Sequence, residues 1–136
     1  KMLNNSKTDP NTAMEARFNR AESYIATKQT EEAINDWRIL SMDTRTEYGA
    51  QATIKLAEHA YNAGQYKEAE DMLLKFIDSG TPHAYWLARG FILLSDVYVK
   101  TDRDMEAKQY LLSLKSNYTE SKEINNMIAD RLAKLK

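Results

Sequence analysis

Two histidines are the side chains of this sequence best suited to acid–base catalysis or metal binding. His59 and His83 lie far apart in the chain, not at the short helical spacing with which two histidines share a metal ion. The sequence has no cysteine, which excludes disulfides and thiolate metal sites. It also has no glycine-rich phosphate loop and no nucleophile elbow. We therefore expect both histidines to be ordinary surface or packing residues, and we expect no enzymatic activity, metal or cofactor.

The charge balance argues against nucleic acid and lipid as partners. The chain carries 19 basic and 20 acidic residues, a formal net charge of −1, so no large attraction to phosphate groups or anionic lipids is expected. No apolar run approaches the roughly 20 residues that cross a bilayer, so we expect no insertion into a membrane. Hydrophobic residues make up 43% of the chain, with only four glycines and two prolines. This composition predicts an all-α fold.

A Glu-Ala pair recurs three times at a nearly constant interval. Its alanines stand at positions 33, 69 and 107, so the intervals are 36 and 38 residues. Large apolar residues follow each alanine after four and seven positions, which is one face of a helix. Another small residue precedes each alanine by twelve positions: Ala21, Ala57 and Ser95. Small residues let two helices approach closely, so each unit is predicted to be a helical hairpin.

The hairpins divide the chain into three units followed by a final helix. The units are expected at about 12–45, 46–81 and 82–118. Residues 119–136 carry Ile124, Ile128, Leu132 and Leu135 at helical spacing, and we expect a capping helix there because repeat arrays need a polar-backed end. Residues 1–11 are expected to be a linker or the end of a preceding repeat, within a longer chain. The sequence thus predicts about seven helices.

The second and third units resemble the tetratricopeptide repeat family. In the second unit the matching residues are Leu56, Ala57, Tyr61, Gly64, Tyr66, Ala69 and Phe76, and in the third they are Leu94, Ser95, Tyr98, Ala107 and Leu114. The first unit departs from the pattern, with Arg20 in the place of Leu56. The resemblance implies a right-handed α-solenoid that acts as a protein-binding scaffold. Units longer than the family average are typical of bacterial envelope assembly proteins, and this analogy points to the periplasm, while a cytoplasmic location stays open.

The resemblance places the candidate binding surface on the first helix of each unit, because these helices would line a concave groove. An apolar stripe is predicted there from Phe18, Ile54 and Ile92, with Ile25, Tyr61 and Val99. An acidic stripe is predicted from Glu22, Glu58 and Asp96. Together they predict a partner peptide or helix with apolar anchors and a Lys or Arg. The alternative is that the apolar stripe packs between first helices and that neighbouring cations pair with the acids.

Three residues near the start of the third unit are secondary candidates for partner binding: Tyr85, Trp86 and Arg89. Tyrosine and tryptophan often dominate the energy of an interface, although an aromatic pair at a helix start can equally pack on the preceding hairpin. A different function is also open, in which the repeats stack on further repeats or on another copy of the chain and bind no peptide.

Cap and turn residues predict where the helices begin and end. Thr30, Asp104 and Thr119 are candidate N-caps, as are Thr8 or Asp9 before Pro10 and Thr81 before Pro82. Gly64 and Gly80 are predicted turn residues.

Overall fold

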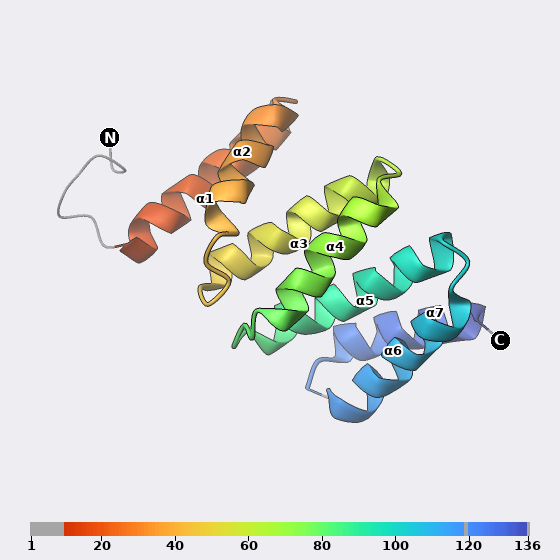
Figure 1. The fold of residues 1–136 in the computed structure, drawn as a ribbon. Coiled ribbons are helices and arrows are strands. Elements are labelled where there is room, and N and C mark those ends of the chain that lie inside the picture. The colour runs from red at the N-terminus through yellow and green to blue at the C-terminus, as the bar shows by residue number, and fades with distance from the viewer. Residues whose placement is uncertain (1–9, 119, 136) are drawn as a thin grey trace.

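The computed structural model describes residues 10–118 and 120–135, and the side chains from residue 13 onward. These residues form seven helices and no strand (Figure 1). The helices are α1 (Pro10–Ala26), α2 (Thr30–Leu40), α3 (Glu47–Asn62), α4 (Tyr66–Asp78), α5 (Ala84–Lys100), α6 (Asp104–Asn117) and α7 (Lys122–Lys134). The all-α prediction is confirmed. Of residues 1–11, expected to be a linker or the end of a preceding repeat, residues 10 and 11 belong to α1, and residues 1–9 lie outside the described residues. No helix in the described part of the chain has the length and apolarity needed to cross a membrane.

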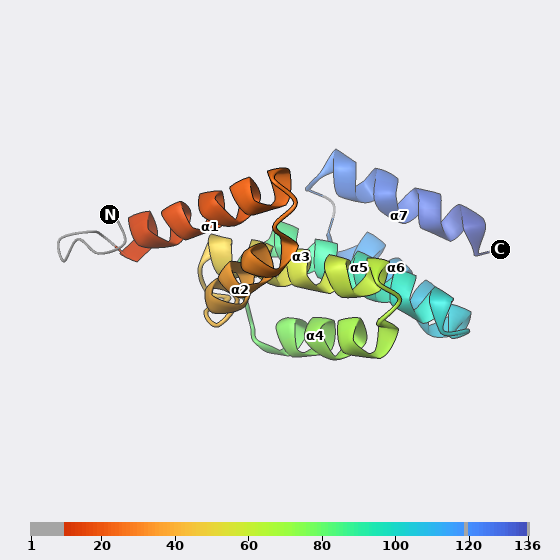
Figure 2. The same cartoon turned by 90° about the horizontal axis from the view of Figure 1, so that it is seen from above.

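The helices pack in the order in which they occur along the chain. Three consecutive pairs, α1 with α2, α3 with α4 and α5 with α6, are the most extensive contacts, and α2, α4 and α6 each also touch the helix that follows. The first helices α1, α3 and α5 form a row that α7 continues. Figure 2 shows α1 and α7 raised at the two ends of this row, whereas α4 lies on its opposite side. We call the side away from α4 the inner face.

Each hairpin closes on a pair of small residues, as the repeat predicts. Ala21 and Ala33 are fully buried in one core cluster, and Ala57 and Ala69 are fully buried in the next. In the third hairpin Ser95 faces the core, and its hydroxyl donates a hydrogen bond to the Ile92 carbonyl at 2.6 Å. A local acceptor therefore satisfies this buried hydroxyl, and the small side chain still permits a close approach.

All three hairpins turn in the same way, although only one has glycine at the turn. Lys28, Gly64 and Asp102 have φ of 64°, 80° and 63°. The amide of the next residue donates to a carbonyl five residues back in each case: Gln29 to Tyr24, Gln65 to Ala60 and Arg103 to Tyr98. These bonds define a Schellman turn. The first and third units therefore keep the turn geometry of the second despite their different residues. Gly80 also has a positive φ, of 72°, as predicted.

Three predicted caps are wrong, two of them because the turns within the hairpins are so short. Thr30 and Asp104 are the first residues of α2 and α6, and the turn residues Gln29 and Arg103 occupy the cap positions without a side-chain cap bond. Thr81 does not cap α5, which begins at Ala84 after His83. The candidates Thr8, Asp9 and Thr119 lie outside the described residues.

Two hydroxyl caps that were not predicted begin the helices after longer loops. Thr46 Oγ1 accepts a hydrogen bond from the Gly49 amide at 3.0 Å at the start of α3. Ser121 Oγ accepts from the Ile124 amide at 3.2 Å at the start of α7. Thr46 and Ser121 both have φ and ψ angles of an extended backbone. Side-chain caps thus occur where the residue before the helix is extended.

Candidate binding surface

Half of the predicted apolar stripe is not available for binding. Phe18, Ile54 and Ile92 are buried, each in a different core cluster. Phe18 of α1, for example, packs against Tyr48 of α3 with ring centroids 5.6 Å apart. The prediction that these three side chains line an open groove is wrong, because they join neighbouring helices of the row. Burial of a large apolar side chain stabilises the fold by about 1.5–3 kcal/mol, which explains why these positions are apolar without a ligand.

The other half of the apolar stripe stays at the surface. Ile25 is 40% exposed and Val99 is 38% exposed. Tyr61 is half-buried and packs edge-on against Tyr66, with ring centroids 5.5 Å apart. These three residues lie at the C-terminal ends of α1, α5 and α3. The surface that could bind a partner therefore runs along the edge of the row that these C-terminal helix ends form.

The acidic stripe is present, but a cation from the next helix of the row pairs with each carboxylate. The closest N–O distances are 3.7 Å for Glu22 with Lys55, 3.1 Å for Glu58 with Arg89 and 2.8 Å for Asp96 with Arg131. We call these three pairs the ion-pair ladder. Because each carboxylate has a cation beside it, the stripe does not present three free negative charges. This geometry agrees with the alternative interpretation of the sequence, in which neighbouring cations pair with the acids.

The ladder connects α1 to α3, α3 to α5 and α5 to α7. Its last pair is the best formed, since Arg131 donates to both Asp96 oxygens, at 2.8 and 2.9 Å. The repeat alignment could not find these partners because their separation in sequence varies, being 31 residues for Glu58 and Arg89 but 35 for Asp96 and Arg131.

Three predicted surface residues meet in one cleft on the inner face. This cleft has a volume of about 360 Å³ and lies where α3, α5, α6 and α7 meet. Tyr61, Asp96 and Val99 line it together with residues that the sequence analysis did not assign to a binding surface: Ser95, Asp104, Leu111, Asp130, Arg131, Lys134 and Leu135. We call it the inner cleft. Ile25 and Glu22 belong to α1 and do not reach it.

The inner cleft offers apolar surface beside unpaired charge. Asp96 is neutralised by Arg131, whereas Asp104 and Asp130 have no ion pair within the described residues. Burial, and then the negative charge of Asp96, raise the pKa of Tyr61. The phenol, protonated at neutral pH like any tyrosine, can donate a hydrogen bond to a ligand.

The secondary candidates are held in an internal network. The Tyr85 and Trp86 rings meet edge-on, with centroids 4.9 Å apart, and the Arg89 guanidinium lies within 6 Å of both centroids. Arg89 donates to the Tyr85 hydroxyl at 3.0 Å, and that hydroxyl donates to Glu123 of α7 at 3.1 Å. Since Arg89 also holds Glu58, these side chains join α3, α5 and α7 and support the row of helices.

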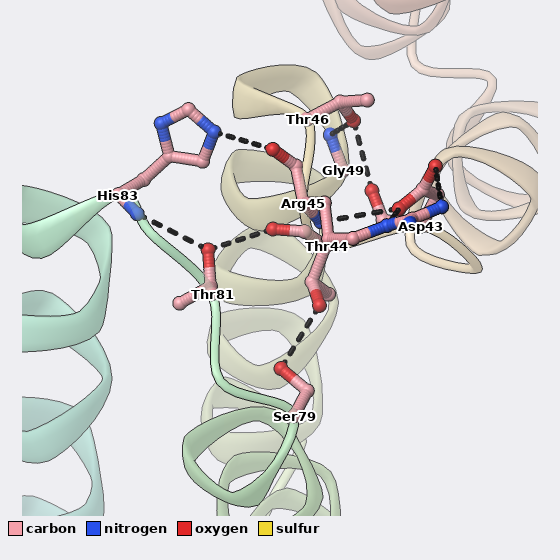
Figure 3. Close-up of polar contacts among 8 residues, drawn as sticks. All are labelled: Asp43, Thr44, Arg45, Thr46, Gly49, Ser79, Thr81 and His83. Carbon is pink, nitrogen blue, oxygen red and sulfur yellow. Dashed lines mark hydrogen bonds and ion pairs between the residues drawn. The ribbon is translucent and has the colours of Figure 1, made fainter.

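The two histidines lie in different surroundings. His59 is exposed on α3. His83 precedes α5, and its Nε2–H donates to the Arg45 carbonyl at 2.8 Å (Figure 3). Among the described residues, no three His, Asp or Glu side chains are grouped so that they could hold a metal ion.

Comparison with known proteins adds no identification to this geometry. No family model matches the chain, and no curated protein sequence matches it.

Proposed function

We propose that this protein is a non-catalytic binding module, a tetratricopeptide-like α-solenoid that holds a peptide or helix of a partner protein on its inner face. One observation carries the proposal: the inner cleft brings together Tyr61, Asp96 and Val99, residues of two different units, and α7 closes it on one side. A cleft built across units is what an array of stacked hairpins would use to bind an extended ligand.

The chemistry of the inner cleft defines the ligand. Val99 and Leu135 supply apolar contact, and Tyr61 supplies an aromatic ring with a hydroxyl. Apart from the Asp96–Arg131 pair of the ladder, the cleft is lined by two carboxylates, Asp104 and Asp130, and one cation, Lys134. The cleft therefore favours a cationic group. We infer a partner segment with an apolar side chain next to a Lys or Arg.

A displayed random-peptide library, selected on the protein, tests this function. Enriched peptides should carry basic and apolar residues together. They should lose at least about tenfold in affinity towards a Val99→Lys, Asp130→Lys variant, because both changes place a cation in the cleft.

The matched control is a Leu112→Lys, Asp78→Lys variant, which makes the same kinds of change at two exposed positions that do not line the cleft. It should bind the enriched peptides as the parent does, and circular dichroism should show equal helix content in all three proteins. If no peptide is enriched, or if the cleft variant binds as tightly as the control, peptide binding in the inner cleft is refuted.

A second function, self-association, is favoured by the apolar surface at the first hairpin. Exposed Ile39 lines a hollow of about 160 Å³ with Ala13, Met14, Arg17 and Leu40. Another copy of the chain could bury this surface without any peptide ligand. A sedimentation-velocity mass that rises with concentration, and that Ile39→Lys returns to the monomer value, would support this function, whereas a constant monomer mass would contradict it.

A further inference from the structure

A second groove lies on the face opposite the inner cleft, between α2 and α4. Both helices pack on α3, but within the described residues no Cα atom of one lies within 8 Å of a Cα atom of the other. The space between them is a groove of about 350 Å³ lined by Arg38, Ser41, Met42, Thr44, Thr53, Leu56, Met72, Lys75, Phe76 and Ser79. We call it the outer groove. A shallower hollow continues from Met72 and Lys75 along α4 towards Gly64.

Two methionines from opposite walls make the outer groove apolar. Met42, in the loop just after α2, is 84% exposed, the highest exposure among the large apolar side chains described. Met72 of α4 is half-buried above Leu56 and Phe76, which form part of the floor. Methionine side chains are flexible and polarizable, so they adapt to different apolar partners. Two methionines that line one groove, one of them highly exposed, therefore form a surface suited to binding.

Two cations face each other across the same groove, and its lining contains no carboxylate. Arg38 belongs to α2 and Lys75 to α4, and neither has an ion pair within the described residues. Each stands in the last turn of its helix, where a cation interacts favourably with the helix dipole. The helix dipole explains why each helix has a cation in its last turn. It does not offset the positive charge of the two cations at the groove, where no carboxylate is among the lining residues.

Hydrogen bonds between two loops fix the width of the outer groove. Thr44 Oγ1 donates to Ser79 Oγ at 2.9 Å, and Thr81 Oγ1 donates to the Thr44 carbonyl at 2.6 Å (Figure 3). These bonds join the loop after α2 to the loop after α4, directly beyond Arg38 and Lys75. The helices that carry the two cations are thus held at a defined separation. A ligand that binds between them loses less free energy to ordering the protein.

We propose that the outer groove binds a partner peptide segment that carries apolar side chains and a carboxylate. The apolar side chains contact Met42 and Met72, and the carboxylate pairs with Arg38 and Lys75. This charge preference is the opposite of that of the inner cleft, so the two faces recognise different segments. The proposal rests on the outer groove alone and does not depend on the proposed function of the inner cleft.

The methionines themselves report on binding when their methyl groups are labelled with ¹³C for NMR. The probes are three terminally blocked peptides of equal length, made of leucine with glutamate, leucine with lysine, and serine with glutamate. The leucine–glutamate peptide should shift the Met42 and Met72 signals in a saturable way, and the other two should not. Met105, 77% exposed on α6, should not respond to any of them.

Absence of a Met42 or Met72 shift with the leucine–glutamate peptide would overturn the proposal. Equal shifts with the leucine–lysine peptide would also overturn it, because any amphipathic peptide would then bind. Equal shifts of Met105 would show non-specific adhesion and would have the same consequence.

A charge-reversed variant tests the role of the two cations. Arg38→Glu with Lys75→Glu should weaken the leucine–glutamate peptide at least about tenfold and make the leucine–lysine peptide the better ligand. The control Lys108→Glu with Lys115→Glu reverses two exposed cations of α6 and should bind as the parent does. If both variants bind the leucine–glutamate peptide equally, Arg38 and Lys75 do not recognise the carboxylate and the proposal fails.

Discussion

Glycine at position 49 shows how one residue can fix the junction between two hairpins. A Cβ added there would lie 2.0 Å from the Asp43 carbonyl oxygen and 2.7 Å from that of Leu40. These atoms belong to the backbone, so they cannot move aside as a side-chain end could. The helix α3 can therefore start this close to the loop that precedes it only with glycine at this position.

We predict that Gly49→Ala destabilises the protein by at least about 1–3 kcal/mol, the usual cost of overpacking. The matched change Gly90→Ala should cost less, because the nearest atom to its Cβ, at 3.1 Å, is on the Phe76 ring, which can shift slightly. Urea unfolding followed by circular dichroism measures both. A Gly49→Ala variant as stable as the parent would show that the loop rearranges at little cost.

At the scale of the element, Arg103 links the turn of the third hairpin to the second hairpin. It donates to both carboxylate oxygens of Glu70 on α4, at 2.6 and 3.1 Å, and its guanidinium lies over the Tyr98 ring at 4.4 Å. The hydrogen bonds from Arg103 lower the pKa of Glu70 below its ordinary value of 4.5. Burial raises the pKa of Tyr98 to about 12, so this ring is neutral beside the pair.

The depressed pKa of Glu70 predicts a loss of stability in acid. The pair stabilises the fold fully above pH 4.5, and its contribution disappears as the pH falls through the lower folded-state pKa. Glu70→Gln should cost roughly 1–2 kcal/mol at pH 7, an amount reduced by the partial exposure of Arg103. The variant should lose less stability than the parent between pH 5 and about pH 3.

Thermal unfolding by circular dichroism across this pH range measures the difference. The control is Glu15→Gln, since Glu15 is exposed beyond the first turn of α1 and has no ion pair within the described residues. It should follow the parent at every pH. If the Glu70→Gln variant loses as much stability in acid as the parent does, the Glu70–Arg103 pair does not cause that loss.

At the scale of the whole molecule, α7 completes the row of first helices. It buries Ile124 and Ile128 against Ala88 and Ile92 of α5, and Arg131 adds the last pair of the ion-pair ladder. The same helix forms a wall of the inner cleft. Its attachment therefore affects both the stability of the array and the candidate binding surface.

We predict that Arg131→Gln loosens α7, because it leaves the half-buried Asp96 carboxylate without its cation, at a cost of about 1–2 kcal/mol. Hydrogen exchange should become faster for the amides of α7, whereas those of α3 and α4 should keep their rates. The control Lys134→Gln removes an exposed cation of the same helix and should leave exchange unchanged. Equal exchange in α7 for parent and Arg131→Gln would show that apolar packing alone holds the helix.

The sequence by itself determined the helices and their pairing. Its apolar spacing and its small residues at fixed separation depend on contacts within one hairpin, which are local in the chain and so leave a periodic pattern. The turns at Lys28 and Asp102, where no glycine marks them, came from the structure. The pattern missed the caps Thr46 and Ser121, because the length of the preceding loop decides which hydroxyl reaches the helix.

Only the tertiary structure decided which side chains are available for binding. An apolar residue on a first helix can face either the neighbouring helix or the solvent, and periodicity within one helix is the same in both cases. Packing between units buries Phe18, Ile54 and Ile92 but leaves Val99 exposed. The cations of the ladder and the walls of both the inner cleft and the outer groove come from helices at irregular sequence separation. Their assembly depends on the stacking angle between hairpins, which no short sequence pattern records.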